Sequence, residues 1–329
     1  MANFRFRQFV PVLAVFLGVF GCASQQSSLH GPTSPSLVEF QKLSIDGSQG
    51  NRVSCPHYVI YSTVADTQLL HHVVELLEGA LCEYRSLAPE VPTSNRPMEC
   101  YLFETRAEWA AFTRAHTGQD APIYLRVNRG GYTVGDWFVA YCIGDTATCS
   151  VTAHEGWHQY VARHLKGRLP PFLEEGLACL FEQVQWEGDL PRWDLTRNEP
   201  RLNSLRSAVA GNHLYPLSQL VRMHAGQVVG KSSAQIEAFY AESWAFARFL
   251  HDGNEGRNRM ALQQMLADAA QGKLYADSSR QLSDGPLWDP ATAKPMLEHY
   301  LAMPLPQIEH KFFDYVAGLV DLPAPASGG

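Results

Sequence analysis

The chain is short of positive charge and lacks internal repeats. Its 329 residues carry 26 Lys and Arg against 33 Asp and Glu, which gives a net charge of −7. Without the first 22 residues, which hold two arginines and no acid, the charge becomes −9 (−7 minus 2). This balance argues against nucleic acid as a partner, because phosphate binding needs a basic surface. The 46% of hydrophobic residues is enough for one domain with a substantial core.

The N-terminus lacks the length of apolar chain that a membrane span requires. Its apolar run, Phe9–Phe20, falls short of the ~20 residues that cross a bilayer and fits the core of a signal peptide. The ending VFGC resembles a bacterial lipobox, with Cys22 as the lipid-bearing residue; an ordinary secretory signal is the alternative. We therefore predict a lipoprotein signal peptide over 1–22, and a membrane-anchored protein of the cell envelope that faces the periplasm or the exterior. The polar continuation predicts a flexible tether over 23–50.

Cysteine pairs of the CxxC type are also absent, so a zinc site built from cysteines is not expected. Six of the seven cysteines remain after Cys22, and an even number in an exported chain permits disulfides. Cys142 and Cys149 bracket a short GDTAT turn and form the predicted local bridge. Buried free thiols are the alternative for Cys82 and Cys179, which lie in apolar helical patterns.

Strand and helix patterns alternate in the first half of the chain. β-rich segments predict strands at 53–64 and 98–105, and the spacing of apolar residues predicts helices at 66–87 and 106–118. The segments IYLRV and GGYTVGDWFVAYCIG predict one or two further strands, with GG as a turn. Beyond Gln185, segments with helical periodicity end at glycine or proline.

These patterns predict an α+β fold with one catalytic domain over 51–322. Its α/β part covers 51–150 and its mainly helical part covers 151–322. The tail over 323–329 is expected to be disordered.

A metal-binding pair stands in the segment HEGWHQYVARHLKGRLPPFLEEGLACLFE. On a helix, residues four apart share a face, so His154 and His158 can reach the same ion. Glu155 lies about 100° round the helix and can act as a base on a water that the metal activates. Imidazole ligands suit zinc, which takes three protein ligands in catalytic sites. The pair therefore needs a third ligand.

Two residues compete for the third ligand position. His164 stands where the metzincin pattern HExxHxxGxxH has its last histidine, but Val161 replaces the glycine that would turn the chain back. The helix should continue to about Leu165 and carry His164 ~9 Å beyond His158 along its axis. In contrast, a loop and two prolines can start a second helix whose first turn faces the histidines. The second glutamate of its EEG sequence, Glu175, is then the predicted ligand.

The combination of HExxH with FLEEGLA resembles the gluzincin zinc peptidases, and most closely the uncharacterised exported peptidase-MA-like proteins of bacteria. The resemblance implies a zincin-like fold and a zinc ion held by His154, His158 and Glu175. It also implies that Tyr240, in FYAESWAFARFL, stabilises the oxyanion; packing of Tyr240 with Phe239 and Trp244 in the core is the alternative. The glycine-rich motif of the aminopeptidases is absent, so exopeptidase activity has no support.

Two functions follow as hypotheses. The first is zinc-dependent hydrolysis of peptide bonds by a monomer that acts on peptides or proteins, with Glu155 as general base. A peptide could pair with an edge strand at Trp137–Tyr141; a strand in the core of the fold is the alternative. The second is a non-catalytic, lipid-anchored binding or scaffold protein on the same fold. Glu174 and Glu182 are expected to be solvated charges, with a role in orienting a histidine as the alternative.

Overall fold

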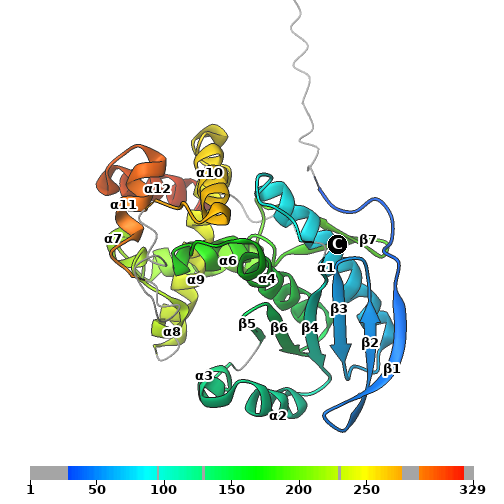
Figure 1. Ribbon diagram of the computed structural model, residues 1–329. Coiled ribbons are helices and arrows are strands. Elements are labelled where there is room, and N and C mark those ends of the chain that lie inside the picture. Colours follow the sequence, from blue (N-terminus) through cyan, green and yellow to red (C-terminus); the bar gives the residue numbers. More distant parts are fainter. Residues whose placement is uncertain (1–28, 95, 128–129, 229–230, 276–288, 322–329) are drawn as a thin grey trace, which may run out of the picture.

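The computed structural model describes residues 29–94, 96–127, 130–228, 231–275 and 289–321. The predicted signal peptide over 1–22, with Cys22, and the predicted tail over 323–329 lie outside the described residues. Among the described residues, no helix combines the length and the apolar character that a membrane crossing needs. Figure 1 shows a sheet with its helices on one side of the molecule and a group of helices on the other.

A six-stranded mixed sheet has the order β1-β2-β3-β4-β6-β5. Its strands are β1 (Glu39–Ile45), β2 (Ser48–Ser54), β3 (Tyr58–Ser62), β4 (Met98–Phe103), β5 (Gly131–Val134) and β6 (Trp137–Tyr141). The pairs β3–β4 and β4–β6 are parallel, and the remaining neighbours are antiparallel. β5 is thus an edge strand that runs antiparallel to β6.

Helix caps define the two crossovers of the sheet. The Asp66 side chain accepts hydrogen bonds from the first backbone N–H groups of α1 (Thr67–Leu87), which links β3 to β4. α2 (Arg106–His116) begins with a capping box between Thr105 and Glu108. Both helices confirm the predictions made from apolar spacing.

The two faces of the sheet contribute to separate cores. Phe138 and Ala140 of β6 belong to the main core, with α1 and α4 (Asp145–His164). Val139 and Tyr141 belong to a smaller core, with α2 and its aromatic side chains. Successive residues of a strand point to opposite faces, so α4 and α2 lie on opposite sides of the sheet.

The second half of the chain is mainly helical, as expected. Its elements are α5 (Pro171–Cys179), α6 (Glu199–Ala210), α7 (Leu217–Leu220), α8 (Ala225–Val228), α9 (Ser233–His251), α10 (Asn258–Gln271), α11 (Ala293–Leu301) and α12 (Leu305–Val320). α5 packs closely along α9, and a Cβ at Gly176 would overlap the Ser243 carbonyl oxygen. A glycine is therefore needed where these two helices touch. The predicted α+β class is confirmed.

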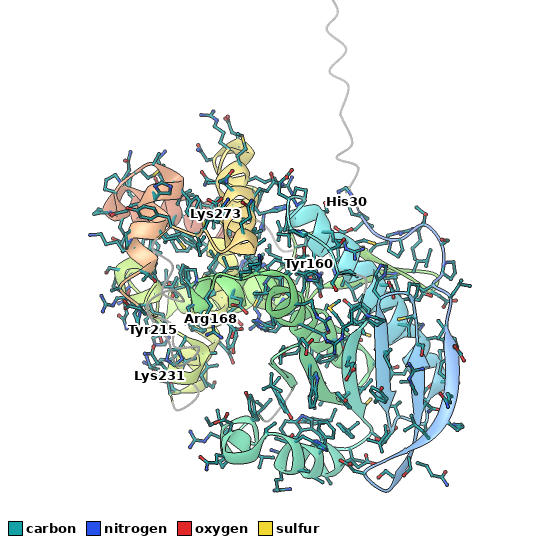
Figure 2. The ribbon with its side chains drawn as sticks, in the orientation of Figure 1. His30, Tyr160, Arg168, Tyr215, Lys231 and Lys273 are labelled. Atoms are coloured by element: carbon teal, nitrogen blue, oxygen red, sulfur yellow. The ribbon has the colours of Figure 1, made fainter. Side chains whose placement is uncertain are left out.

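The predicted tether over 23–50 is wrong for much of its length. The His30 backbone pairs with that of Trp193, and the carboxylate of Glu75 accepts hydrogen bonds from the backbone and hydroxyl of Ser36. Figure 2 labels His30 at the start of this segment. Residues 39–50 then form β1 and the start of β2. The polar stretch that suggested a tether ends at Ser36, before β1, which is held mainly by backbone pairing and exposes most of its side chains.

Three smaller predictions are also corrected. The single strand at 53–64 is in fact the end of β2 followed by β3. The IYLRV segment is not a strand, because its start belongs to the short helix α3 (Ala121–Tyr124). The helical part contains a hairpin that no pattern indicated, β7 (Val184–Glu187) with β8 (Leu190–Trp193).

The predicted disulfide does not form. Cys142 and Cys149 are both free, as are the other four cysteines among the described residues. Thr148, rather than Cys149, approaches the Cys142 sulfur, with its hydroxyl 3.9 Å away. Neighbouring residues on α4 point about 100° apart, and Cys149 faces the core instead.

Candidate metal centre

The two HExxH histidines and Glu175 meet where α4 and α5 pack together. α4 runs unbroken through both histidines and ends at His164. The connection then turns the chain, and Pro171 opens α5 four residues before Glu175. His154, His158 and Glu175 are all half-buried in the resulting junction.

Three donor atoms form a nearly regular triangle. The Nε2 atoms of His154 and His158 are 3.3 Å apart. The Glu175 Oε2 atom lies 3.3 Å from the first and 3.6 Å from the second. Tetrahedral zinc with bonds of about 2.0–2.1 Å requires ligand separations of about 3.3–3.4 Å. Glu175 Oε2 is also buried and accepts no well-aligned hydrogen bond from the described residues. The residues therefore fit a zinc ion.

A carboxylate holds the other ring nitrogen of each histidine. His158 Nδ1 donates to Glu174 at 2.9 Å, and His154 Nδ1 donates to Glu182 at 3.0 Å. The expectation that these two glutamates are solvated charges is therefore wrong. A partner on Nδ1 leaves Nε2 free for the metal and fixes the orientation of the ring.

Glu182 is itself held in place by residues of the α6 region. Arg201 donates from Nε and Nη2 to its two oxygens at 2.8 and 2.6 Å. Asn198 donates to it from Nδ2 at 2.9 Å. A bidentate arginine contact is among the strongest and most directional interactions of a carboxylate. The orientation of His154 thus depends on a chain of contacts that reaches into the helical part.

Glu175 and His158 shift each other's pKa in opposite directions. Burial would raise the pKa of Glu175, but the charge of His158 and the proximity of both histidines hold it well below its usual range. For His158, burial acts to lower the pKa, and the charge of Glu175 and the contact with Glu174 raise it to about 10. These charges keep the Glu175 carboxylate ionised, as a metal ligand must be, whereas His158 would have to release a proton when it binds a metal.

Glu155 lies next to the triangle on the side of the sheet edge. The Thr133 hydroxyl, on β5, is 3.0 Å from its carboxylate Oε2 and 3.1 Å from its backbone oxygen. This contact connects the candidate general base to the edge strand. The edge is β5 rather than the predicted Trp137–Tyr141, which forms β6 inside the sheet.

Tyr240 projects from α9 toward the centre. Its ring centroid is 6.5 Å from that of His154, and the Arg201 guanidinium lies 5.0 Å above the ring. It also contacts Phe239, whereas Trp244 is fully buried farther along the helix. The charge of Glu175, and then burial, raise the pKa of the Tyr240 hydroxyl, which therefore remains a proton donor.

His164 lies outside the centre, as predicted from Val161. Its Nδ1 contacts the Tyr160 carbonyl oxygen at 2.9 Å, and its Nε2 accepts a hydrogen bond from the Ser94 backbone at 3.3 Å. Gly156, which interrupts the HExxH helix sequence, has a packing role. The Tyr84 hydroxyl would lie 2.7 Å from a Cβ at this position, and it donates to the Ala153 carbonyl oxygen.

Several residues of the centre had no signal in the sequence. Arg201, Asn198 and Thr133 join it only through tertiary packing. Glu182, seven residues after Glu175, had the weak signal of two helical turns. A second group of possible ligands, His154 with Cys179 and Glu182, shares the imidazole of the first. Comparisons of the chain with protein-family models, with curated proteins and with solved structures found no match.

Proposed function

We propose that the protein is a zinc-dependent peptidase with a zincin-like fold. His154, His158 and Glu175 would hold the ion, and the 3.3–3.6 Å triangle of their donor atoms carries the proposal. The orienting carboxylates Glu174 and Glu182 support it, because histidines that bind a metal usually donate their other ring N–H to a carboxylate.

The residues around the three ligands have separate roles in amide hydrolysis. Bound zinc supplies a Lewis acid that activates water and polarises a carbonyl group. Glu155 accepts the proton of the attacking water and delivers it to the departing nitrogen. Thr133 holds the carboxylate of Glu155 in place. Tyr240 donates a hydrogen bond to the oxyanion that develops on the carbonyl oxygen.

An extended peptide is the substrate that the edge strand favours. β5 pairs with β6 on one side, and on its other side no neighbouring strand is present among the described residues. A peptide that adds to this side would run past Glu155, because Thr133 of β5 contacts that residue. We therefore expect the cleaved bond to lie within an extended segment of the substrate.

Export and lipid anchoring belong to the same proposal. The basic start, the apolar run and Cys22 support a lipoprotein of the cell envelope, and we propose that it acts as a monomer. The protein would then hydrolyse peptides or proteins close to a membrane surface.

Replacement of Glu155 by glutamine tests the proposal. The glutamine side chain keeps the size of the original but cannot accept the proton, so the hydrolysis of an unbiased peptide library should fall by more than about 100-fold. Zinc content, measured by mass spectrometry of the metal, should stay at the wild-type level.

Two outcomes would contradict the peptidase. Wild-type protein that binds zinc but cleaves no peptide of the library would favour the scaffold function. Unchanged cleavage by the Glu155→Gln variant would remove Glu155 from the mechanism.

A further inference from the structure

The second face of the sheet, opposite the metal centre, is only partly covered. α2 and α3 pack over one end of it, around Trp109 and Tyr132. The uncovered part holds a cavity of about 320 Å³. Its floor is formed by Tyr61 on β3, Tyr101 on β4 and Trp137 on β6. We call this cavity the aromatic trough.

An open aromatic face is unusual on these strands. β3, β4 and β6 pair in parallel, and parallel strands are normally covered on both faces. Here Tyr61 and Tyr101 are neighbours in register with ring centroids 5.2 Å apart, and Trp137 lies 5.5 Å from Tyr101. All three side chains are half-buried rather than covered. Apolar surface of this kind, left accessible, marks a binding site.

Polar groups surround the aromatic floor. The tip of the β1–β2 hairpin supplies Ser44 and Asp46, and the end of α2 supplies His116, whose Nε2 lies 3.2 Å from the Asp46 carboxylate. The Tyr101 hydroxyl donates to Glu99 at 3.4 Å. Donors and acceptors are thus mixed around the rim, and the carboxylates exclude an anionic ligand.

The charges close to the trough are nearly balanced. Asp46 and Glu99 stand against Arg52, which is in register with Tyr61 and donates to Ser54, and the Asp46 carboxylate already has the His116 ring as a hydrogen-bond partner. A ligand with a net charge would be repelled by the group near the trough that carries a charge of the same sign. A purely apolar ligand would leave the rim without a partner.

We propose that the aromatic trough binds an uncharged saccharide. A pyranose ring has an apolar face of C–H groups for an aromatic floor and hydroxyl groups that both donate and accept hydrogen bonds. The volume of the trough is at the lower end of ligand pockets and suits one or two sugar rings. The site lies on the far side of the sheet from the metal centre. Sugar binding would therefore hold the protein at a glycan independently of its hydrolytic activity.

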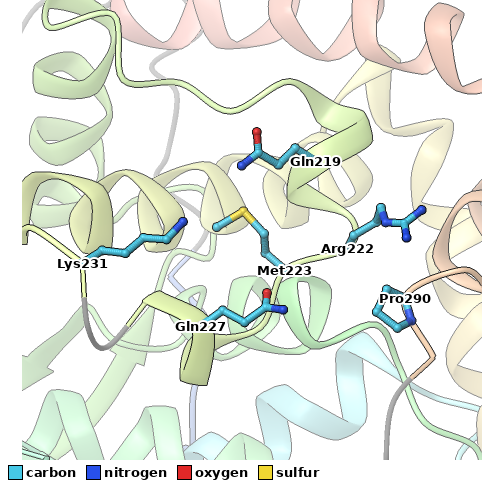
Figure 3. Close-up of a pocket in the computed structure, with 6 residues that line it drawn as sticks. All are labelled: Gln219, Arg222, Met223, Gln227, Lys231 and Pro290. Carbon is cyan, nitrogen blue, oxygen red and sulfur yellow. The ribbon is translucent and has the colours of Figure 1, made fainter.

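A second cavity of similar size has a different lining and serves for comparison. It has a similar volume, about 350 Å³, and is lined by Arg222, Lys231 and two glutamines among its residues (Figure 3). Its side chains supply two cations and no aromatic floor. This cavity is the natural control for sugar binding.

Calorimetric titration of the wild-type protein with chitotriose, cellotriose and maltotriose tests the proposal. At least one should bind saturably. Trp137→Ala should weaken its binding by about tenfold, because the floor loses its largest ring. Tyr61→Phe keeps the ring, removes only the hydroxyl group, and should weaken binding by about threefold. Gln219→Ala in the cavity of Figure 3 should have no effect.

The far-UV circular dichroism and the melting temperature of each variant show whether it is folded, and Tyr61→Phe remains informative if Trp137→Ala is not. Saturable binding by none of the three sugars would overturn the proposal. Binding that both trough variants leave unchanged would also overturn it, as would a phenylalanine-containing tripeptide that competes out the sugar with higher affinity. Binding that persists in Glu155→Gln separates this site from the metal centre, so either proposal can fail alone.

Discussion

Two regions of the molecule bury carboxylates and have opposite effects on them. At the metal centre, Glu175 and Glu182 lie against histidines and Arg201, and their pKa values are held below the usual range. On α9, Glu242 is fully buried with the Tyr215 backbone N–H as its hydrogen-bond partner. Burial raises the pKa of Glu242 to about 8, and the Tyr215 contact only partly opposes this.

The difference shows what sustains a buried charge. Loss of water disfavours the ionised form in both regions, so burial alone cannot explain an ionised carboxylate. Cationic partners at hydrogen-bond distance reverse the effect only at the metal centre. Such a concentration of mutually dependent charges costs stability unless every member is paired, and it is typical of functional sites.

The largest effect is expected when one of the three candidate ligands is removed from the metal centre. Glu175→Ala should reduce zinc affinity by more than about 100-fold, because the loss of an orienting partner alone costs 10–100-fold. Competition with a chromophoric chelator measures the affinity. His164→Ala is the matched control and should change it little. A larger loss of zinc affinity in His164→Ala than in Glu175→Ala would mean that His164, and not Glu175, is the third ligand.

The contact between α5, which carries Glu175, and α9, which carries Glu242, can be disrupted by a steric clash. Gly176→Ala would force a Cβ against the Ser243 carbonyl oxygen and should lower the free energy of unfolding by about 3 kcal/mol. Gly318→Ala, on α12 with nothing within 4 Å of its Cβ, should instead be neutral or slightly stabilising. Urea denaturation compares them, and equal stability of the two variants would contradict the close approach of α5 and α9.

The buried carboxyl group of Glu242 should make the stability of the protein depend on pH. A carboxyl with a raised folded-state pKa stabilises the protein below its unfolded pKa, and this contribution is lost as pH rises through about 8. The wild-type protein should therefore lose about 3 kcal/mol of stability between pH 5 and pH 8 that Glu242→Gln does not lose. Denaturation at both pH values tests this. Parallel curves for the two proteins would mean that Glu242 is ionised.

The smallest effect is expected at the edge of the charged region. Thr133→Val removes the hydroxyl contact with Glu155 and should lower kcat by about tenfold with little change in KM or zinc content. Thr133→Ser keeps the hydroxyl group and should restore most of the rate. Equal losses in both variants would point to packing of β5 rather than to the hydrogen bond.

Local patterns in the sequence were enough to predict much of this structure. The start of α1 near residue 66, its apolar periodicity and the helical second half all depend on neighbouring residues, and all are confirmed. The spacing of His154 and His158, the valine that keeps α4 straight and the prolines that start α5 also act locally. They predict the three candidate ligands and place His164 outside this set.

Only the tertiary structure decided what surrounds these ligands. Strand pairing made an ordered β1 out of a polar segment and placed the free edge at β5 rather than β6. The packing of α5 against α4 and of α6 against α9 brought Glu182 and Arg201 to His154, and the packing of α5 on α9 explains Gly176. The GDTAT segment that suggested a Cys142–Cys149 bridge is instead the start of α4, and both cysteines are free. Sequence alone determined the helices and the ligand types, because these follow from local geometry. The orientation of each ligand, its protonation and the aromatic trough depend on residues that are distant in the chain and meet only in the folded molecule.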